Sequence, residues 1–270
     1  MTKSSPWPKL LAPLGILLAA ALLAAAGSVW WSGSGTTMVN DGGLGELIAV
    51  TQAARAEANA AVQGSAESFE SLTADRASMT SLRGAVAANQ AASADARRLA
   101  SDSALWQRIE TNLDKVLASR EALAELEKAR AEISQLGPEL LVAASNVASA
   151  LPAADLTANQ PYLLRFEVMV DSLQQRARGL GPTTSVTDTV RRLGDAEQYI
   201  GQFLSGLRGE DASLGVVSAK AGAAAAELKS LSELHDQTRQ AIAEITAGAE
   251  ALVAVLTAIR EFDRGGPRAT

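Results

Sequence analysis

The most constraining feature of the sequence is an uncharged, apolar run from Leu10 to Trp31. At about 1.5 Å per residue, a helix of this length crosses the roughly 30 Å apolar core of a bilayer. Lys3 and Lys9 precede the run and two tryptophans end it, so the positive charge and the interfacial aromatic residues both predict a cytoplasmic N-terminus. We therefore predict that residues 1–31 are a short cytoplasmic start followed by a transmembrane helix.

A cleaved signal peptide is the alternative for this segment. Ala24, Ala25 and Ala26 are followed by Gly27, which is a small-residue cleavage pattern after an apolar region. The length of the run and its terminal tryptophans favour an uncleaved anchor. Both interpretations place the bulk of the chain outside the cytoplasm, and the anchor predicts location in the inner membrane with that bulk in the periplasm.

The composition of the remaining chain predicts helix. Hydrophobic residues make up 47% of the sequence but aromatic residues only 4%, so alanine and leucine supply most of the apolar surface. Ala, Leu, Glu, Gln and Arg are strong helix formers. The predicted fold class is all-α, with the N-terminal transmembrane helix followed by an elongated, antiparallel helical bundle.

The spacing of apolar and turn-forming residues divides the chain. Residues 32–43 are rich in Gly and Ser and have no apolar period, which predicts a flexible linker. Residues 44–262 carry the helical pattern, and residues 263–270 form a tail that contains Gly-Gly-Pro. The predicted elements begin with an interrupted helix over 44–84, which has a break near Gly64, and a weakly helical connection over 84–101. A helix follows from Leu105 to a break or kink at Gly137–Pro138, then a turn over Ala153–Gln160 and helices over 162–178, 187–208 and 216–262.

A repeated tripeptide hints at an internal duplication. Leu82-Arg83-Gly84 and Leu207-Arg208-Gly209 each end a predicted helix, and a longer helix follows each of them. This pattern predicts two similar, stacked helical modules, with repeats of about 44–136 and 137–262. Ordinary helix capping is the alternative explanation, because helices often end at a glycine.

The residues needed for several kinds of chemistry are absent from the sequence. A net charge of −6 gives no basic surface for nucleic acid, and there is no cysteine. The only histidine is His235, which we expect on the exposed side of the last helix beside Glu233, Asp236 and Gln237. No nucleotide-binding, zinc-protease or nucleophile-elbow motif occurs. We therefore expect no enzymatic activity, no metal and no cofactor.

Several segments of the predicted exported region share their order and spacing with a known family. Glu46–Gly64 contains Thr51-Gln52, and further segments follow at Trp106–Leu126, Leu136–Leu140, Tyr199–Gly209 and Leu214–Ile245. Together they resemble the N-terminal sensor region of type IV pilus methyl-accepting chemotaxis transducers of the PilJ type. In this resemblance, Thr51-Gln52 falls on the Ser-Gln of the first repeat and Gly64 on its glycine. The resemblance covers nearly the whole predicted exported region.

The resemblance implies a periplasmic sensor region of a membrane chemoreceptor that controls type IV pilus (twitching) motility. Such a region detects a ligand or pilin and transmits the signal through long helices, as a homodimer or higher oligomer. Family members continue into a second membrane helix, a HAMP module and a cytoplasmic coiled coil that contacts CheA and CheW. This sequence contains none of these, so we expect CheA- or CheW-type partners only through a part outside it.

The resemblance also suggests candidate ligand-binding residues. The arginine that follows Ser-Gln in the family is Ala53 here, and Arg55 lies two positions further on. Related domains of nitrate and nitrite sensor kinases use an arginine of this region to hold the anion, so Gln52 and Arg55 are candidates if they face the bundle centre. Arg55 facing solvent is the alternative. The alternative function for the whole chain is a membrane-anchored structural or scaffolding protein of the cell envelope.

Overall fold

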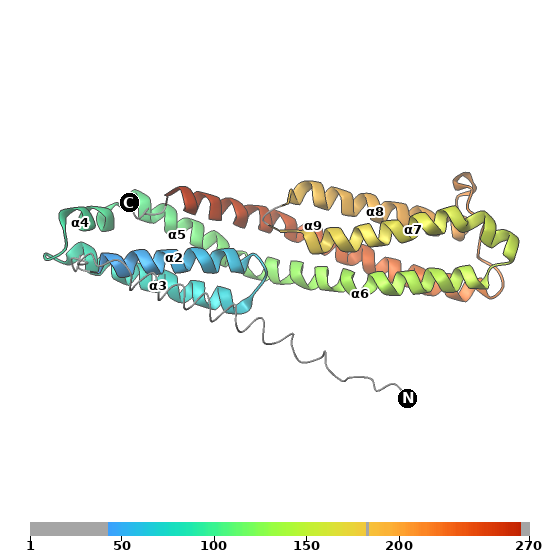
Figure 1. The fold of residues 1–270 in the computed structure, drawn as a ribbon, viewed down its shortest axis with the longest axis horizontal. Coiled ribbons are helices and arrows are strands. Elements are labelled where there is room, and N and C mark those ends of the chain that lie inside the picture. Colours follow the sequence, from blue (N-terminus) through green and yellow to red (C-terminus); the bar gives the residue numbers. More distant parts are fainter. Residues whose placement is uncertain (1–42, 182–183, 266–270) are drawn as a thin grey trace, which may run out of the picture. The chain divides into compact units, whose positions relative to one another are not determined.

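The computed structural model describes residues 43–181 and 184–265, with side chains as far as residue 262. Every regular element in these ranges is a helix (Figure 1). The all-α prediction is therefore confirmed for the described part of the chain. The predicted anchor at residues 1–31, nearly all of the linker and most of the tail lie outside the described residues. The described ranges belong to one unit, Gly42–Thr270.

Eight α-helices and a short 3-10 helix make up the described elements. They are α2 (Leu44–Ala61), α3 (Ala66–Ala88), α4 (Ala94–Ser101), α5 (Ser103–Ala118), α6 (Arg120–Ala150), α7 (Ala153–Gly179), α8 (Val186–Leu207), η1 (Ala212–Leu214) and α9 (Ala224–Gly265).

The helices of this unit pack as two bundles that follow one another along α9 (Figure 1). The first half consists of α2, α3, α5 and the C-terminal part of α9, with α4 packed against α3. The second half consists of α6, α7, α8 and the N-terminal part of α9. The first half therefore combines segments from both ends of the described chain, and α9 belongs to both halves.

The first predicted helix, over 44–84, is interrupted near Gly64 as expected, but the interruption is the turn of a helical hairpin. Gly64 adopts the left-handed backbone region, with φ 75°, and this reverses the chain after α2. Ser65 then caps α3, because its hydroxyl accepts a hydrogen bond from the N–H of Ser68 at 3.3 Å. Two helices joined by a tight turn keep the same apolar period on both sides, so spacing alone did not distinguish a hairpin from an interrupted helix.

The predicted weak connection over 84–101 is also corrected. The α3 helix passes Gly84 without ending and continues to Ala88. The α4 helix follows, and the hydroxyl of Ser93 caps it by accepting from the N–H of Ala96 at 3.1 Å. By contrast, α8 does end at Leu207, just before Gly209 with φ 69°. The two Leu-Arg-Gly tripeptides therefore do not mark equivalent helix ends.

The sequence predicts a break or a kink at Gly137–Pro138, and the break is wrong, because α6 runs through Pro138 without ending. Proline in a helix interior removes a hydrogen bond and costs about 3 kcal/mol. Leu136 and Leu140 are buried on either side of it, so tertiary packing outweighs the local preference. The predicted repeat boundary between residues 136 and 137 thus lies inside a helix.

The following turn and the start of the next helix are corrected as well. The chain turns at Leu151–Pro152, and Ala153–Gln160 is the start of α7 instead of a turn. Pro161 lies inside α7, whereas the sequence predicts it just before the helix. At the other end of the chain, α9 starts at Ala224, eight residues after the predicted start at Val216.

By length and composition, Ala224–Phe262 of α9 is able to cross a membrane, and it is the one helix of the described residues that passes this test. A core helix of a helical bundle passes the same test. Here α9 packs against α2, α5, α6 and α8. Leu231, Ile245 and Val255 are fully buried by these contacts, which accounts for its apolar character. We therefore describe α9 as the core helix that both halves share.

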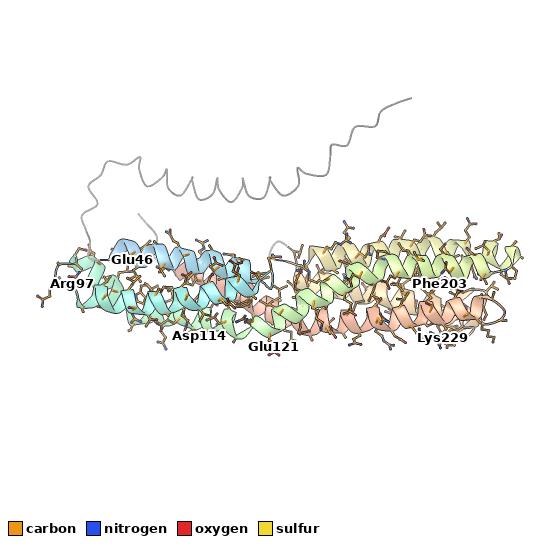
Figure 2. All side chains as sticks on the ribbon, turned by 90° about the horizontal axis from the view of Figure 1, so that it is seen from below. Glu46, Arg97, Asp114, Glu121, Phe203 and Lys229 are labelled. Carbon is orange, nitrogen blue, oxygen red and sulfur yellow. The ribbon has the colours of Figure 1, made fainter. Side chains whose placement is uncertain are left out.

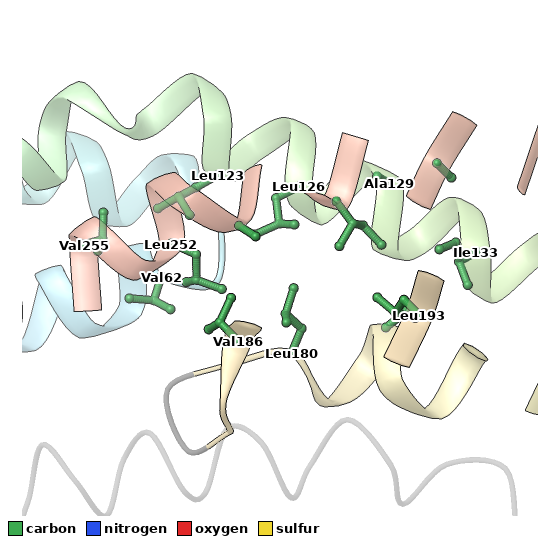
Figure 3. Close-up of a cluster of buried hydrophobic side chains, with 14 of the residues drawn as sticks. Val62, Leu123, Leu126, Ala129, Ile133, Leu180, Val186, Leu193, Leu252 and Val255 are labelled. Carbon is green, nitrogen blue, oxygen red and sulfur yellow. The ribbon is translucent and has the colours of Figure 1, made fainter. Parts of the chain in front are cut away.

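Apolar side chains fill the junction between the two halves (Figure 3). Val62 follows α2, Leu180 follows α7 and Val186 begins α8, and all three are buried at this level. They meet Leu123 and Leu126 of α6 and Leu252 and Val255 of α9.

The backbone of α9 also approaches α6 closely at this level. A Cβ on Gly248 of α9 would lie 3.0 Å from the Cβ of Leu126. The junction is thus a packed core, continuous with that of both halves.

Candidate functional site

The segment between η1 and α9, together with Leu214 at the end of η1, lies along the second half and shapes a pocket there. We call residues 214–219 the strap. The side chain of Asn159 on α7 is fully buried and holds the strap at both backbone groups of Val217. Its Nδ2 donates to the carbonyl of Val217 at 2.9 Å, and its Oδ1 accepts from the N–H at 2.7 Å. The N–H of Ala219 also donates to the carbonyl of Leu207 at 2.7 Å.

Two glycines permit the close approach of the strap to its neighbours. A Cβ on Gly206 of α8 would lie 2.7 Å from the Cβ of Val216, which is closer than real Cβ atoms approach. Gly215 has φ 70°, and a Cβ on it would lie 2.7 Å from the Tyr162 hydroxyl. Side chains at either position would displace the strap from the helices.

A pocket of about 370 Å³ opens between α7, α8 and the strap. Pro161, Tyr162 and Arg165 line it from α7, Tyr199, Gln202 and Phe203 from α8, and Leu214 and Val216 from the strap and its start. The α8 residues lie at positions i, i+3 and i+4, which share one helix face. The volume falls within the range of small-molecule sites.

Both tyrosines of the chain line this pocket. The guanidinium carbon of Arg165 lies 4.4 Å from the centre of the Tyr199 ring, so the cation stacks on the aromatic face. Phe166 of α7 and Phe203 of α8 also pack against each other, with ring centres 5.4 Å apart. Burial raises the pKa of Tyr199 above its usual range, while nearby Arg165 opposes this shift and Tyr162 adds to it. The phenol is therefore a hydrogen-bond donor at neutral pH.

The electrostatics of the pocket favour an anion. Arg165 is its one cationic lining residue, and none of the eight lining residues is acidic. Within the described residues, Arg165 forms no ion pair and the Tyr199 hydroxyl has no hydrogen-bond partner. A cation thus lines the pocket beside an apolar wall, and a buried, unpaired hydroxyl lies next to it. This arrangement is suited to binding an anion.

The candidates from the sequence, Gln52 and Arg55, lie elsewhere. Both are exposed on α2 in the first half. Arg55 borders a cavity of about 10 Å³ that it shares with Asn112 and Phe262, and Gln52 does not line that cavity. Such a volume holds about one water molecule. The ligand-binding role of these two residues stays a prediction.

The pocket residues are not among the sites predicted from the sequence. In the sequence, Tyr162 marks only the start of a predicted helix and Tyr199 the start of one of the segments that carry the resemblance. One signal in the sequence could have indicated the pocket: both tyrosines of the chain lie on two consecutive predicted helices, 162–178 and 187–208. Recognising it required the strap, which the helical pattern of Val216–Phe262 concealed. No group of metal-ligating side chains occurs among the described residues.

The predicted exposure of His235 is wrong. Its side chain is buried, at 6% exposure, where α9 packs on α8. Nε2 lies 3.1 Å from Oε1 of Glu197, and the ring packs against Gly201. Burial lowers the pKa of His235, and this effect exceeds the opposing influence of Glu197 and Asp236, while Arg239 adds to it.

This lowered pKa predicts a pH dependence of stability. As the pH falls below about 6.5, the unfolded chain takes up a proton before the folded one does, so the unfolding free energy decreases until the folded-state pKa is passed. We expect the melting temperature to drop between about pH 7.5 and 5.5, and His235→Gln to abolish most of that drop. Thermal melts of both proteins check this. A drop of equal size in the variant would assign the effect to other groups.

Comparison of the chain with protein-family models finds no match, and comparison with curated proteins finds none either. The geometry alone therefore defines the class of site: a small, mixed polar and apolar binding pocket at the side of a helical bundle.

Proposed function

We propose that residues 44–262 are the periplasmic sensor region of a membrane chemoreceptor for type IV pilus (twitching) motility. In this proposal the second half binds a ligand and α9 carries the resulting shift to the first half. Residues 1–31 anchor the chain in the inner membrane. The observation that carries the proposal is the continuity of α9 through both halves, with a pocket beside one of them.

The position of the pocket supports this proposal. Figure 2 places Phe203, which lines the pocket, far along the unit from Glu46 at the start of α2. The C-terminal part of α9 lies beside α2, since Phe262 and Arg55 border one cavity. A displacement at the pocket that moves α9 would therefore reach α2, the first described helix after the predicted anchor in the sequence.

The packed junction supports transmission by rigid helices. Signals travel between distant sites through packed elements that have discrete arrangements. The cluster around Leu126, Val186 and Leu252 joins elements of both halves without a flexible linker (Figure 3). A small shift of α9 is thus passed on as a movement of a whole helix.

The proposal is tested in cells that carry the gene. Deletion of residues 44–262 is expected to abolish the response of the chemosensory kinase, and of twitching motility, to pilus retraction. An unchanged kinase response after this deletion would contradict the proposal. The exposed Arg97→Gln substitution serves as a control and is expected to leave the response intact.

A second replacement separates sensing from scaffolding. Residues 44–262 are exchanged for an unrelated helical hairpin of equal length, which preserves a spacer but removes the pocket and the junction. A sensor region loses its response in this chimera. Full retention of function would instead assign the chain to the alternative class, a membrane-anchored structural or scaffolding protein.

A further inference from the structure

We propose that the pocket between α7, α8 and the strap binds small organic monocarboxylates that carry an aromatic or bulky aliphatic group. This inference rests on the proposed function only for its biological use. The binding itself is a property of the pocket and is tested on the isolated chain.

The charge of the ligand follows from Arg165. Its guanidinium is permanently charged and presents several donors in one plane, which matches the geometry of a carboxylate. Arg165 lines the pocket, and its guanidinium stacks on the Tyr199 ring, with the guanidinium carbon 4.4 Å from the ring centre. A ligand with one negative charge balances this single cation, whereas a dianion such as a phosphate ester leaves excess charge near an apolar wall.

The remaining polar groups fit the same ligand. The Tyr199 hydroxyl is buried and has no partner within the described residues, so it has an unused donor. Tyr162 and Gln202 add a hydroxyl and an amide to the lining. A carboxylate accepts from several donors at once, and a ligand that reaches Tyr199 satisfies a polar group that is otherwise unpaired.

The rest of the ligand follows from the apolar side of the pocket. Pro161, Phe203, Leu214 and Val216 are its aliphatic and phenyl lining residues. A ring or branched chain of the ligand placed against them is removed from water, which favours binding. The volume of about 370 Å³ accommodates one such group. Amines are disfavoured, because no acidic residue lines the pocket to balance their charge.

The two tyrosines provide a selective probe. Since the chain has two tyrosines and both line the pocket, fluorine NMR of the full chain labelled with 3-fluorotyrosine reports only on this site. The chain is titrated in detergent with phenylacetate, the probe ligand. Phenylacetamide, phenethylamine, acetate and phenyl phosphate test the neutral, cationic, truncated and dianionic alternatives.

We expect phenylacetate to shift both resonances saturably and to bind at least about tenfold more tightly than any of the four comparison compounds. Arg165→Gln should weaken phenylacetate binding by at least about tenfold. Arg97→Gln, which makes the same change on an exposed residue of the first half, should leave it unchanged (Figure 2). Tyr199→Phe, followed through Tyr162 alone, should weaken binding about threefold or more without lowering the melting temperature.

Three results would overturn the inference: no saturable shift with phenylacetate up to about 10 mM, equal binding of phenylacetate and phenylacetamide, or full affinity in the Arg165→Gln variant. Each is distinct from failure of the sensor proposal. Binding without any kinase response would contradict the sensor role alone, while a kinase response to retraction without carboxylate binding would contradict the ligand class alone.

Discussion

Replacing Trp106 with alanine is expected to lower the unfolding free energy by about 3–5 kcal/mol, because it empties a large volume from the core of the first half. Trp106 on α5 is 1% exposed. Its indole Nε1 donates to the carbonyl of Leu99 at 2.8 Å, which ties α5 to α4. Arg83 of α3 stacks on the ring, with its guanidinium carbon 5.8 Å from the ring centre. The substitution thus removes contacts of α5 with two other elements, α3 and α4, at once.

Urea unfolding of the full chain, followed by far-ultraviolet circular dichroism, measures this loss. Trp106→Phe keeps most of the ring volume and should cost clearly less than the alanine variant. Gln107→Ala, at the exposed neighbouring position, should stay within about 0.5 kcal/mol of the parent. A loss below about 1 kcal/mol for Trp106→Ala would mean that this core is not packed as described.

The same variant also tests the junction. Both tyrosines lie in the second half, so tyrosine absorbance follows that half separately from the helical signal of the whole chain. Because α9 and the junction cluster belong to both halves, we expect the tyrosine transition to shift by the same amount as the overall transition. A tyrosine transition that stays at the parent midpoint would show that the halves unfold independently.

Helix content was predictable from the sequence because it depends on local preference and apolar spacing, whereas helix ends were not. Gly64 and Gly84 look alike in sequence, yet only Gly64 turns the chain, and Gly84 lies inside α3. Pro138 is a residue that predicts a helix break where none occurs, because the burial of its neighbours keeps α6 intact. Which glycine or proline ends a helix is decided by contacts between elements distant in sequence.

The candidate site was less predictable for the same reason. Arg165 and Tyr199 lie on different helices, and the strap that closes their pocket was concealed in an apolar stretch that fits a helical period. His235 shows a further limit. Its sequence neighbours are charged, but its own position faces Glu197 of α8. A residue's sequence neighbours indicate the average polarity of a helix turn and do not fix which face is covered.

Replacing Asn159 with leucine is expected to detach the strap from α7 and to lower the unfolding free energy by about 2–5 kcal/mol. Asn159 is fully buried, and its amide satisfies both the N–H and the carbonyl of Val217. Leucine has a similar volume but no polar atom, so both backbone groups would be left without partners. Asn159→Asp should also destabilise the chain, since it loses the donor to the carbonyl and buries a charge.

The control for this substitution is Gln160→Leu, which adds the same side chain at the exposed next position and should change the unfolding free energy by less than about 0.5 kcal/mol. In Asn159→Leu, the two fluorotyrosine resonances should move or broaden even without ligand, because the strap carries part of the pocket wall. The affinity for phenylacetate should also decrease in this variant. If the resonances, the affinity and the unfolding free energy all match the parent chain, the two hydrogen bonds to Val217 do not hold the strap. The pocket would then owe its shape to the packing of Val216 against Gly206 instead.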